Sequence, residues 1–317
     1  MKISICMATY NGAAYLGDQL NSFLSQTRLP DELIISDDGS TDNTMEMLLE
    51  FSKMAPFPTK IFRNPRKQGI SRNFCSAVEV AAGDLVLLCD QDDIWFDTKL
   101  HEVETWAKRD ADVWLLMNDA EITNVHLEKQ GFSKLDQIEK AGIDEKYFVM
   151  GCCSAIRRPL LELAMPIHEN FDSHDDWFSF YGSTLDRKKI YRKSLQLYRL
   201  HENNNSQFIV NSTNRVNRAL VLWHRVKKIF NKDQLLRQDK DELLRATYLA
   251  EANEKFKGSD YNILYDRSLV ELNILKLRGH TRLLYLPKRI IKIVANMRNE
   301  VYGAPTQYRL VFRDLVG

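Results

Sequence analysis

A dense group of acidic side chains follows an apolar run near residue 90. The run LVLLC is followed by Asp90, Asp92 and Asp93, which places three carboxylates within four positions. Carboxylates this close repel one another, and a bound divalent cation is the usual compensation. Mg²⁺ or Mn²⁺, which prefer oxygen ligands, would suit this group. The alternative is a solvated acidic turn that caps a helix beginning near Asp97, and the sequence leaves both interpretations open.

Two further polar segments follow apolar runs in the same way. The first is TYNG, with Thr9, Tyr10 and Asn11, after the run ISICMA; the second is DDGS, with Asp37 and Asp38, after LIIS. The two aspartates also suit a turn that caps the next helix, and local sequence does not separate that role from ligand binding. If these runs are parallel strands, their carboxyl ends meet at one edge of a sheet, where ligands bind.

The elements that must position these segments alternate between strands and helices. The apolar runs predict strands at residues 3–8, 33–36, 59–62 and 85–89, and the intervening residues show helical spacing of apolar side chains. One such helix is predicted from about Ser71 to Ala82. Strands that alternate with helices predict an α/β fold with a mostly parallel sheet.

The charge distribution predicts two regions. The chain has 317 residues, of which 44% are hydrophobic and 27% charged, and this composition is typical of globular proteins rather than of disordered or fibrous ones. Residues 1–204 contain 23 basic and 32 acidic residues, whereas residues 205–317 contain 21 and 11. An Asn- and Ser-rich stretch lies at the change. We therefore predict a catalytic domain over 1–204 and a basic helical region over 205–317.

The hydrophobic pattern and the cysteine spacing both predict a cytoplasmic protein. No apolar run approaches the roughly 20 residues that cross a bilayer, and the first residues lack the long apolar stretch of a signal peptide. The five cysteines show no C-x-x-C spacing. Reduced thiols in the packed interior are therefore expected rather than disulfides or zinc ligands. The cysteines are Cys6, Cys75, Cys89, Cys152 and Cys153.

In combination, these motifs resemble a nucleotide-sugar glycosyltransferase of family 2, which has the GT-A fold. The resemblance rests on SICMATYNG, PDELIISDDGSTDNT, NPRKQGISRNF and AAGDLVLLCDQDDIW, and continues through MGCCSAIRRPLLELAMP and SHDDWFSFYG to LYRLHENNNS. It covers about two-thirds of the chain. The DQDDIW version is similar to bacterial rhamnosyltransferases of surface-polysaccharide assembly. The resemblance implies a GT-A domain with a donor-binding half at about 1–110 and an acceptor half at about 111–204.

The resemblance assigns roles to the polar segments. Thr9 and Asp38 occupy positions that hold the nucleotide, where a carboxylate can accept hydrogen bonds from the base or ribose. Asp90 and Asp92 match the D-x-D motif, which faces the ribose and binds the Mn²⁺ or Mg²⁺ that bridges the diphosphate. Asp93 could assist through a water or through a bond to another ligand. The predicted nucleotide-sugar site also includes Tyr10, Asn11, Asp37 and Arg72.

Two later motifs supply a candidate base and a candidate metal ligand. The stretch HDDW resembles an H-D-x-W pattern in which Asp175 aligns with the base that deprotonates the acceptor hydroxyl, with Asp176 as the close alternative. Capping of a helix before Trp177 is the other interpretation of this pair. The stretch YRLH resembles a Y-R-x-H segment, which makes His201 a candidate third metal ligand, with a structural loop histidine as its alternative.

The function implied by the resemblance is inverting, metal-dependent sugar transfer. The expected donor is a nucleoside-diphosphate sugar, first dTDP-rhamnose and then UDP-hexoses, and the expected acceptor is a saccharide that can be lipid-linked. Two alternatives come from other classes. A haloacid-dehalogenase-like phosphohydrolase also places an aspartate pair after a strand, but here the pair comes late and lacks the usual Gly-Thr or Val-Thr context. A non-catalytic sugar-nucleotide-binding scaffold would bind the donor without transfer.

The basic region carries two candidate amphipathic helices. Residues 219–230 and 283–294 combine an apolar stripe with interleaved Lys and Arg. Such helices suit peripheral contact with the inner face of the cytoplasmic membrane, and the alternative is packing on the catalytic domain or on a second subunit. The region has no recognition motif for nucleic acid, so a nucleic-acid partner is not expected.

Overall fold

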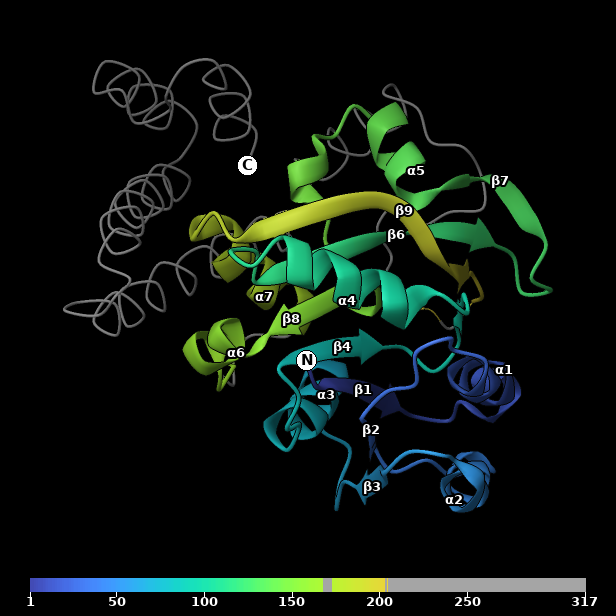
Figure 1. Cartoon of the computed structure of the whole chain (residues 1–317). Helices are drawn as coiled ribbons and strands as arrows, with labels where there is room; N and C mark the ends of the chain where they lie inside the picture. Colours follow the sequence, from blue (N-terminus) through green and yellow to red (C-terminus); the bar gives the residue numbers. More distant parts are fainter. Residues whose placement is uncertain (168–172, 203, 205–317) are drawn as a thin grey trace, which may run out of the picture. The chain divides into compact units, whose positions relative to one another are not determined.

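The computed structural model describes residues 1–167, 173–202 and 204, and a nine-stranded sheet organises this part of the chain (Figure 1). The strands are β1 (Ile3–Thr9), β2 (Glu32–Asp37), β3 (Thr59–Arg63), β4 (Leu85–Cys89), β5 (Ile94–Trp95), β6 (Leu115–Thr123), β7 (Lys129–Ser133), β8 (Ser154–Arg157) and β9 (Lys188–Arg199). Their order is β3-β2-β1-β4-β8-β6-β9-β5, and β7 pairs with β6.

Helices connect these strands and cover the sheet. The α-helices of the described residues are α1 (Ala13–Leu24), α2 (Thr44–Met54), α3 (Ile70–Glu79), α4 (Lys99–Arg109), α5 (Lys134–Lys140), α6 (Arg158–Ala164) and α7 (His174–Thr184). Two short 3₁₀ turns, η1 (Glu145–Tyr147) and η2 (Gly151–Cys153), precede β8. All seven residues of β1 are buried, as expected for a central strand with both faces covered.

The predicted α/β fold is confirmed, and its first half follows the predicted alternation closely. Strands β1 to β4 lie where the apolar runs placed them, and they pair in parallel. The predicted helix at 71–82 is α3, which ends at Glu79. After β4 the sheet becomes mixed, because β8 runs antiparallel to both β4 and β6 while β9 is parallel to β6. Parallel pairing thus joins β1 to β4 and also β6 to β9, so the sheet is mixed rather than mostly parallel as predicted.

The remaining sequence predictions about organisation have different outcomes. All five cysteines are buried and free, which confirms their expected place in the interior. Among the residues that the structure describes, no helix has the length and apolar character needed to cross a bilayer. The two candidate amphipathic helices and most of the Asn- and Ser-rich stretch lie outside the described residues.

Gly83 offers a direct test of the packing between β1 and β4. A Cβ at this position would lie 2.5 Å from Ser4 Oγ, 2.7 Å from Ser4 N and 3.0 Å from Leu85 O. Gly83→Ala is therefore expected to lower the free energy of unfolding by about 1–3 kcal/mol, because backbone atoms must move. The measurement is the urea midpoint. The matched control is Gly17→Ala in α1, where the nearest atom is Met47 Cε at 3.6 Å.

Alanine at the control position removes backbone freedom from the unfolded chain, so Gly17→Ala is expected to stabilise by about 0.5–1 kcal/mol. Equal midpoints for Gly83→Ala and the unsubstituted protein would contradict the close approach described above.

Candidate active site

The carboxyl ends of β1, β2 and β4 meet at one edge of the sheet, as predicted. Thr9 pairs with Asp37 in the parallel register of β1 and β2, and its Oγ1 donates to Asp37 Oδ2 at 3.0 Å. The Tyr10 N–H donates to Gln91 Oε1 at 2.9 Å, and Gln91 Nε2 returns a bond to Tyr10 O at 3.1 Å. The segments after β1, β2 and β4 therefore form one connected surface.

Asp37 shapes the turn after β2. Its side chain is fully buried, and Oδ1 accepts from the N–H groups of Gly39 at 3.1 Å and Ser40 at 2.8 Å. Oδ2 accepts from Thr9 Oγ1 at 3.0 Å and from Ser40 Oγ at 2.5 Å. A carboxylate has about four acceptor positions, so this one is saturated within the protein. Of the two roles that the sequence left open for Asp37, the hydrogen bonds correspond to the turn role.

Asp38, by contrast, keeps an acceptor position for a ligand. Its Oδ1 accepts from Asn64 Nδ2 at 3.0 Å and from the Gln68 N–H at 2.8 Å, and Oδ2 accepts from the Gly69 N–H at 2.8 Å. Gly69 has a φ of +89°, a left-handed conformation that suits glycine. Three bonds leave about one of four acceptor positions open on Oδ2.

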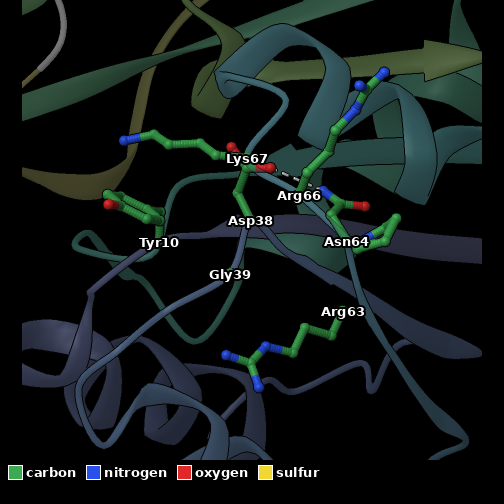
Figure 2. Close-up of a pocket in the computed structure, with 8 residues that line it drawn as sticks. Tyr10, Asp38, Gly39, Arg63, Asn64, Arg66 and Lys67 are labelled. Carbon is green, nitrogen blue, oxygen red and sulfur yellow. Dashed lines mark hydrogen bonds between the residues drawn. The ribbon is translucent and has the colours of Figure 1, made fainter.

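That carboxylate lines a cavity of about 520 Å³ (Figure 2). The ammonium of Lys67 lies 3.7 Å from the centroid of the Tyr10 ring, and Arg63 Nη2 donates to Ser40 O at 3.0 Å. Three cationic side chains, Arg63, Arg66 and Lys67, line the cavity with one carboxylate, and this excess of positive charge suits an anionic ligand. The lining residues are Tyr10, Asp38, Gly39, Arg63, Asn64, Pro65, Arg66 and Lys67.

The acidic loop after β4 carries strongly perturbed carboxyl groups. Burial, followed by the charges of Asp92 and Asp93, raises the pKa of Asp90 well above its ordinary value. Burial and the Asp92 charge raise the pKa of Asp93 to about 7. The loop does not cap the following helix, because the N-cap of α4 is Thr98. Burial and the repulsion between neighbouring carboxylates both raise these pKa values, and a bound cation would offset the repulsion.

Strand β9 and helix α4 hold Asp93 in place. Gln196 Nε2 donates to Asp93 Oδ2 at 2.7 Å, and the Arg199 N–H donates to Oδ1 at 3.3 Å. Lys99, which is 1% exposed, donates to Gln196 Oε1 and to Cys152 O. Burial lowers the pKa of this lysine. Asp93 thus faces the protein interior and supports the loop.

The predicted metal ligands lie in two adjoining groups. Asp92 Oδ2 is 2.8 Å from His201 Nε2, so the structure brings these two predicted ligands together. Asp90 lies instead with Asp93 and the thiol of Cys152, and the ligand atoms of these three residues are all within 4.8 Å of one another. Carboxylate oxygens suit Mn²⁺ or Mg²⁺, so the carboxylates present fit a divalent cation.

The two candidate bases lie in the first turn of α7, whose N-cap is Ser173. Ser173 Oγ and the Asp176 N–H both donate to Asp175 Oδ1, at 2.7 and 2.9 Å. The Asp175 charge also contributes to the raised pKa of Asp90, which places this carboxylate near the acidic loop. The Asp176 charge acts instead on Lys188. Burial lowers the pKa of Lys188 to about 8, and the Asp176 charge partly offsets this effect. The Asp175 charge thus acts on the acidic loop, and the Asp176 charge acts on Lys188.

The first turn of α7 is fixed by α3 and η2. Ser71 Oγ accepts from the His174 N–H at 2.9 Å, and the His174 ring stacks on Phe74 with centroids 4.2 Å apart. A Cβ on Gly151 would lie 2.9 Å from His174 Nε2 and 3.5 Å from Asp175 Cβ. The glycine therefore lets η2, which carries Cys152, lie against the candidate base.

Two other predicted residues have supporting positions. Asn11, with a φ of +48°, accepts from the Thr41 N–H through Oδ1 at 2.8 Å and so joins the first two segments. Arg72 is half-buried on α3, where the next residue, Asn73, donates to Thr9 O at 3.0 Å.

The structure also adds Asn64, Asn73, Gln91 and Gln196, which the sequence analysis did not single out. Asn64 directly follows β3, so the strand-end rule applied to the other strands would have found it.

A comparison with known families identifies the chain. The sequence model described as glycosyl transferase family 2 matches residues 4–163, which is just over half of the chain and includes the acidic loop and the Asp38 cavity. The chain belongs to this family. The segments that end β1, β2 and β4 all lie within the part of the chain that this family model matches.

Curated relatives of this chain include proteins named for the sugars that they transfer. It is 30% identical over 217 residues to dTDP-rhamnosyl transferase RfbG of Shigella flexneri, covering 62% of this chain and 72% of RfbG. It is 37% identical over 117 residues to abequosyltransferase RfbV of Salmonella typhimurium, covering 36% of this chain and 35% of RfbV. The chain spans about a third of the length of RfbV, and also of the uncharacterized glycosyltransferase alr2836 of Nostoc, of which 32% is covered.

Solved structures share the fold of the transferase. TarS 1-349 of S. aureus in complex with UDP-GlcNAc has a TM-score of 0.55 at 16% identity, covering 100% of this chain and 90% of TarS 1-349. Mannosyltransferase PcManGT of Pyrobaculum calidifontis, in complex with GDP-Man and Mn²⁺, has a TM-score of 0.51 at 14% identity, covering 99% of this chain and 86% of PcManGT. At such identities the likeness shows a common GT-A fold.

Proposed function

We propose that this family 2 transferase is an inverting, metal-dependent enzyme of bacterial surface-polysaccharide synthesis, which moves a sugar from a nucleoside diphosphate to a saccharide hydroxyl. The observation that carries the proposal is the contact of Asp92 with His201 at the end of β4, beside the Asp38 cavity. Tyr10 connects the two places, because its ring lines the cavity while its backbone bonds to Gln91 of the acidic loop.

In the proposed donor site, the base and ribose lie in the Asp38 cavity and the diphosphate lies near the acidic loop. Asp38 Oδ2 accepts a hydrogen bond from the base or ribose, and the cationic lining attracts the anionic nucleotide. Asp90, Asp92 and His201 would hold Mn²⁺ or Mg²⁺ near the diphosphate. When bound, the cation supplies positive charge against the leaving nucleoside diphosphate.

Asp175 is the base in this proposal. It takes the proton of the acceptor hydroxyl as that oxygen attacks the anomeric carbon, while the bond between sugar and phosphate breaks on the opposite face. The Ser173 hydroxyl and the Asp176 N–H hold Oδ1 of the carboxylate, so that its other oxygen can face the acceptor. Direct displacement needs no covalent intermediate with the enzyme and inverts the configuration of the sugar.

The proposed donor is dTDP-rhamnose, with UDP-hexoses as the second choice. RfbG, which shares 30% identity over most of its length, is named a dTDP-rhamnosyl transferase, and TarS was solved with UDP-GlcNAc. A lipid-linked saccharide acceptor at the inner leaflet also belongs to the proposal. The basic composition of residues 205–317 supports peripheral contact with anionic lipids there, from a cytoplasmic location.

Thermal stabilisation by sugar nucleotides, with and without Mn²⁺, tests the donor. A ligand present at 100 times its Kd adds about 2.7 kcal/mol to the free energy of unfolding, which raises Tm by several degrees. We expect dTDP-rhamnose to raise Tm with Mn²⁺ and a chelator to abolish the rise. Failure of every sugar nucleotide to stabilise the protein would refute the proposal.

Two further assays separate the alternative classes. Release of phosphate from simple esters without an acceptor would indicate a phosphohydrolase, and donor binding without transfer to any acceptor would indicate a scaffold.

A further inference from the structure

The Tyr15 side chain on α1 contacts two residues of the segment that ends β9. Its ring stacks on the His201 imidazole with centroids 4.6 Å apart and planes inclined by 26°. The guanidinium carbon of Arg199 lies 4.8 Å from the centroid of the same tyrosine ring. Tyr15 is half-buried, and the stack covers an imidazole whose side chain is only 8% exposed.

The His201 imidazole depends on contacts outside the sheet for its orientation. β9 ends at Arg199, so His201 lies two residues beyond the last strand position. Its backbone N–H donates to Asn204 Oδ1 at 2.5 Å, which fixes the main chain but not the rotation of the side chain. Its Nε2 must nevertheless meet Asp92 Oδ2 at 2.8 Å.

Helix α1 presents one face to this segment. Tyr15 and Asp18 are three positions apart on the helix and therefore lie on the same side. Asp18 Oδ2 accepts from Arg199 Nη2 at 2.6 Å, and Arg199 Nε donates in turn to Asp92 O at 3.0 Å. One helix face thus fixes the backbone of the acidic loop through Arg199 and covers the imidazole through Tyr15.

We propose that Tyr15 is a positioning residue, whose ring holds the His201 imidazole with Nε2 toward Asp92 so that both groups can bind one cation. This inference rests on the metal-dependent function proposed above, and extends it to a residue that has no ligand atom in the metal site. The effect operates through the stack, so the aromatic ring is required and the tyrosine hydroxyl is not.

Binding of Mn²⁺ alone, followed by the electron paramagnetic resonance signal of the free ion, tests the inference without an activity assay. We expect Tyr15→Ala to weaken Mn²⁺ binding by about 3- to 10-fold, the range of a lost aromatic stack. Tyr15→Phe keeps the ring and is expected to stay within about twofold of the unsubstituted protein. Tyr147→Ala removes a tyrosine that is 55% exposed, serves as the matched control and should leave binding unchanged.

A double-mutant cycle separates positioning of the imidazole from a general effect on the fold. In a His201→Ala background, Tyr15→Ala should cause no further loss of Mn²⁺ affinity, because the group that it orients is gone. Alanine suits a helix, so α1 should persist. If the urea midpoint of Tyr15→Ala nevertheless falls, Tyr15→Leu fills the space without an aromatic face and replaces it in the cycle.

Three results would overturn the inference. They are unchanged Mn²⁺ affinity in Tyr15→Ala, an equal loss in Tyr15→Phe, and an equal loss of affinity in the His201→Ala background. A different result, no binding of Mn²⁺ by the unsubstituted protein, would overturn the metal-dependent function itself and this inference with it. Failure of the inference is distinguishable from failure of the proposed function, because the first three results require an unsubstituted protein that binds Mn²⁺.

Discussion

Asp92→Asn is expected to lower the rate of sugar transfer about 100- to 1000-fold, the usual effect of removing one group that stabilises charge in a transition state. The amide keeps the size of the side chain but loses the negative charge that would hold a cation. His201 Nε2, 2.8 Å from Asp92 Oδ2, would lose its carboxylate partner at the same time. Initial rates at saturating donor and Mn²⁺ measure the effect, and Mn²⁺ affinity should fall in parallel.

The matched control for this change is Asp97→Asn. Asp97 is exposed, follows β5 and lies five residues beyond Asp92, so it changes the net charge equally without touching the acidic loop. Its transfer rate should stay within about twofold of the unsubstituted protein, as for other exposed substitutions. Unchanged turnover in Asp92→Asn, together with kinetics that do not respond to a chelator, would remove the basis for a metal-dependent mechanism.

Asp175→Asn is expected to lower kcat about 100- to 10,000-fold, because general base catalysis contributes an amount of this order. Asn Oδ1 can still accept the bonds from Ser173 Oγ and the Asp176 N–H, so the first turn of α7 should keep its geometry. Donor affinity should therefore change little. Single-turnover rates and donor binding, measured on the same preparation, separate the chemical step from binding.

Asp176→Asn, one residue along α7, is the comparison that discriminates between the candidate bases. Its carboxylate acts on Lys188 rather than on the acidic loop, so kcat should fall by less than about tenfold. A large loss in Asp176→Asn with little loss in Asp175→Asn would reverse the assignment. Full activity in both variants would mean that another group deprotonates the acceptor.

The sequence predicted β1, β2 and β4 well because these parallel strands are buried on both faces. β1, β2 and β4 are buried along their whole length, which produces apolar runs that end in clear turn residues. β5 has two residues, and only one of the five residues of β7 is buried. Short or half-exposed antiparallel strands give weak periodicity, and their pairing depends on contacts distant in sequence.

The candidate site likewise has features that the sequence predicts and features that depend on tertiary contacts. The acidic loop was predictable because three carboxylates within four residues repel one another in any fold, and something must offset this repulsion. Asp37 and Asp38 have the same chemistry and adjacent positions, so only the directions of their hydrogen bonds separate a turn residue from a ligand-facing one. The support of Asp93 by Gln196 could not be predicted, because it depends on the register of β9 against β5.

Strand β9 is the last described strand in sequence, and this has a consequence for how the protein folds during synthesis. Gln196 and Arg199 are more than a hundred residues later in the chain than the acidic loop they support. The strands and loops around Asp38 lie within the first 70 residues and emerge from the ribosome much earlier. A growing chain therefore contains the residues around Asp38 long before it contains the residues that support the acidic loop. During synthesis, the acidic loop waits for β9 before its supporting hydrogen bonds can form.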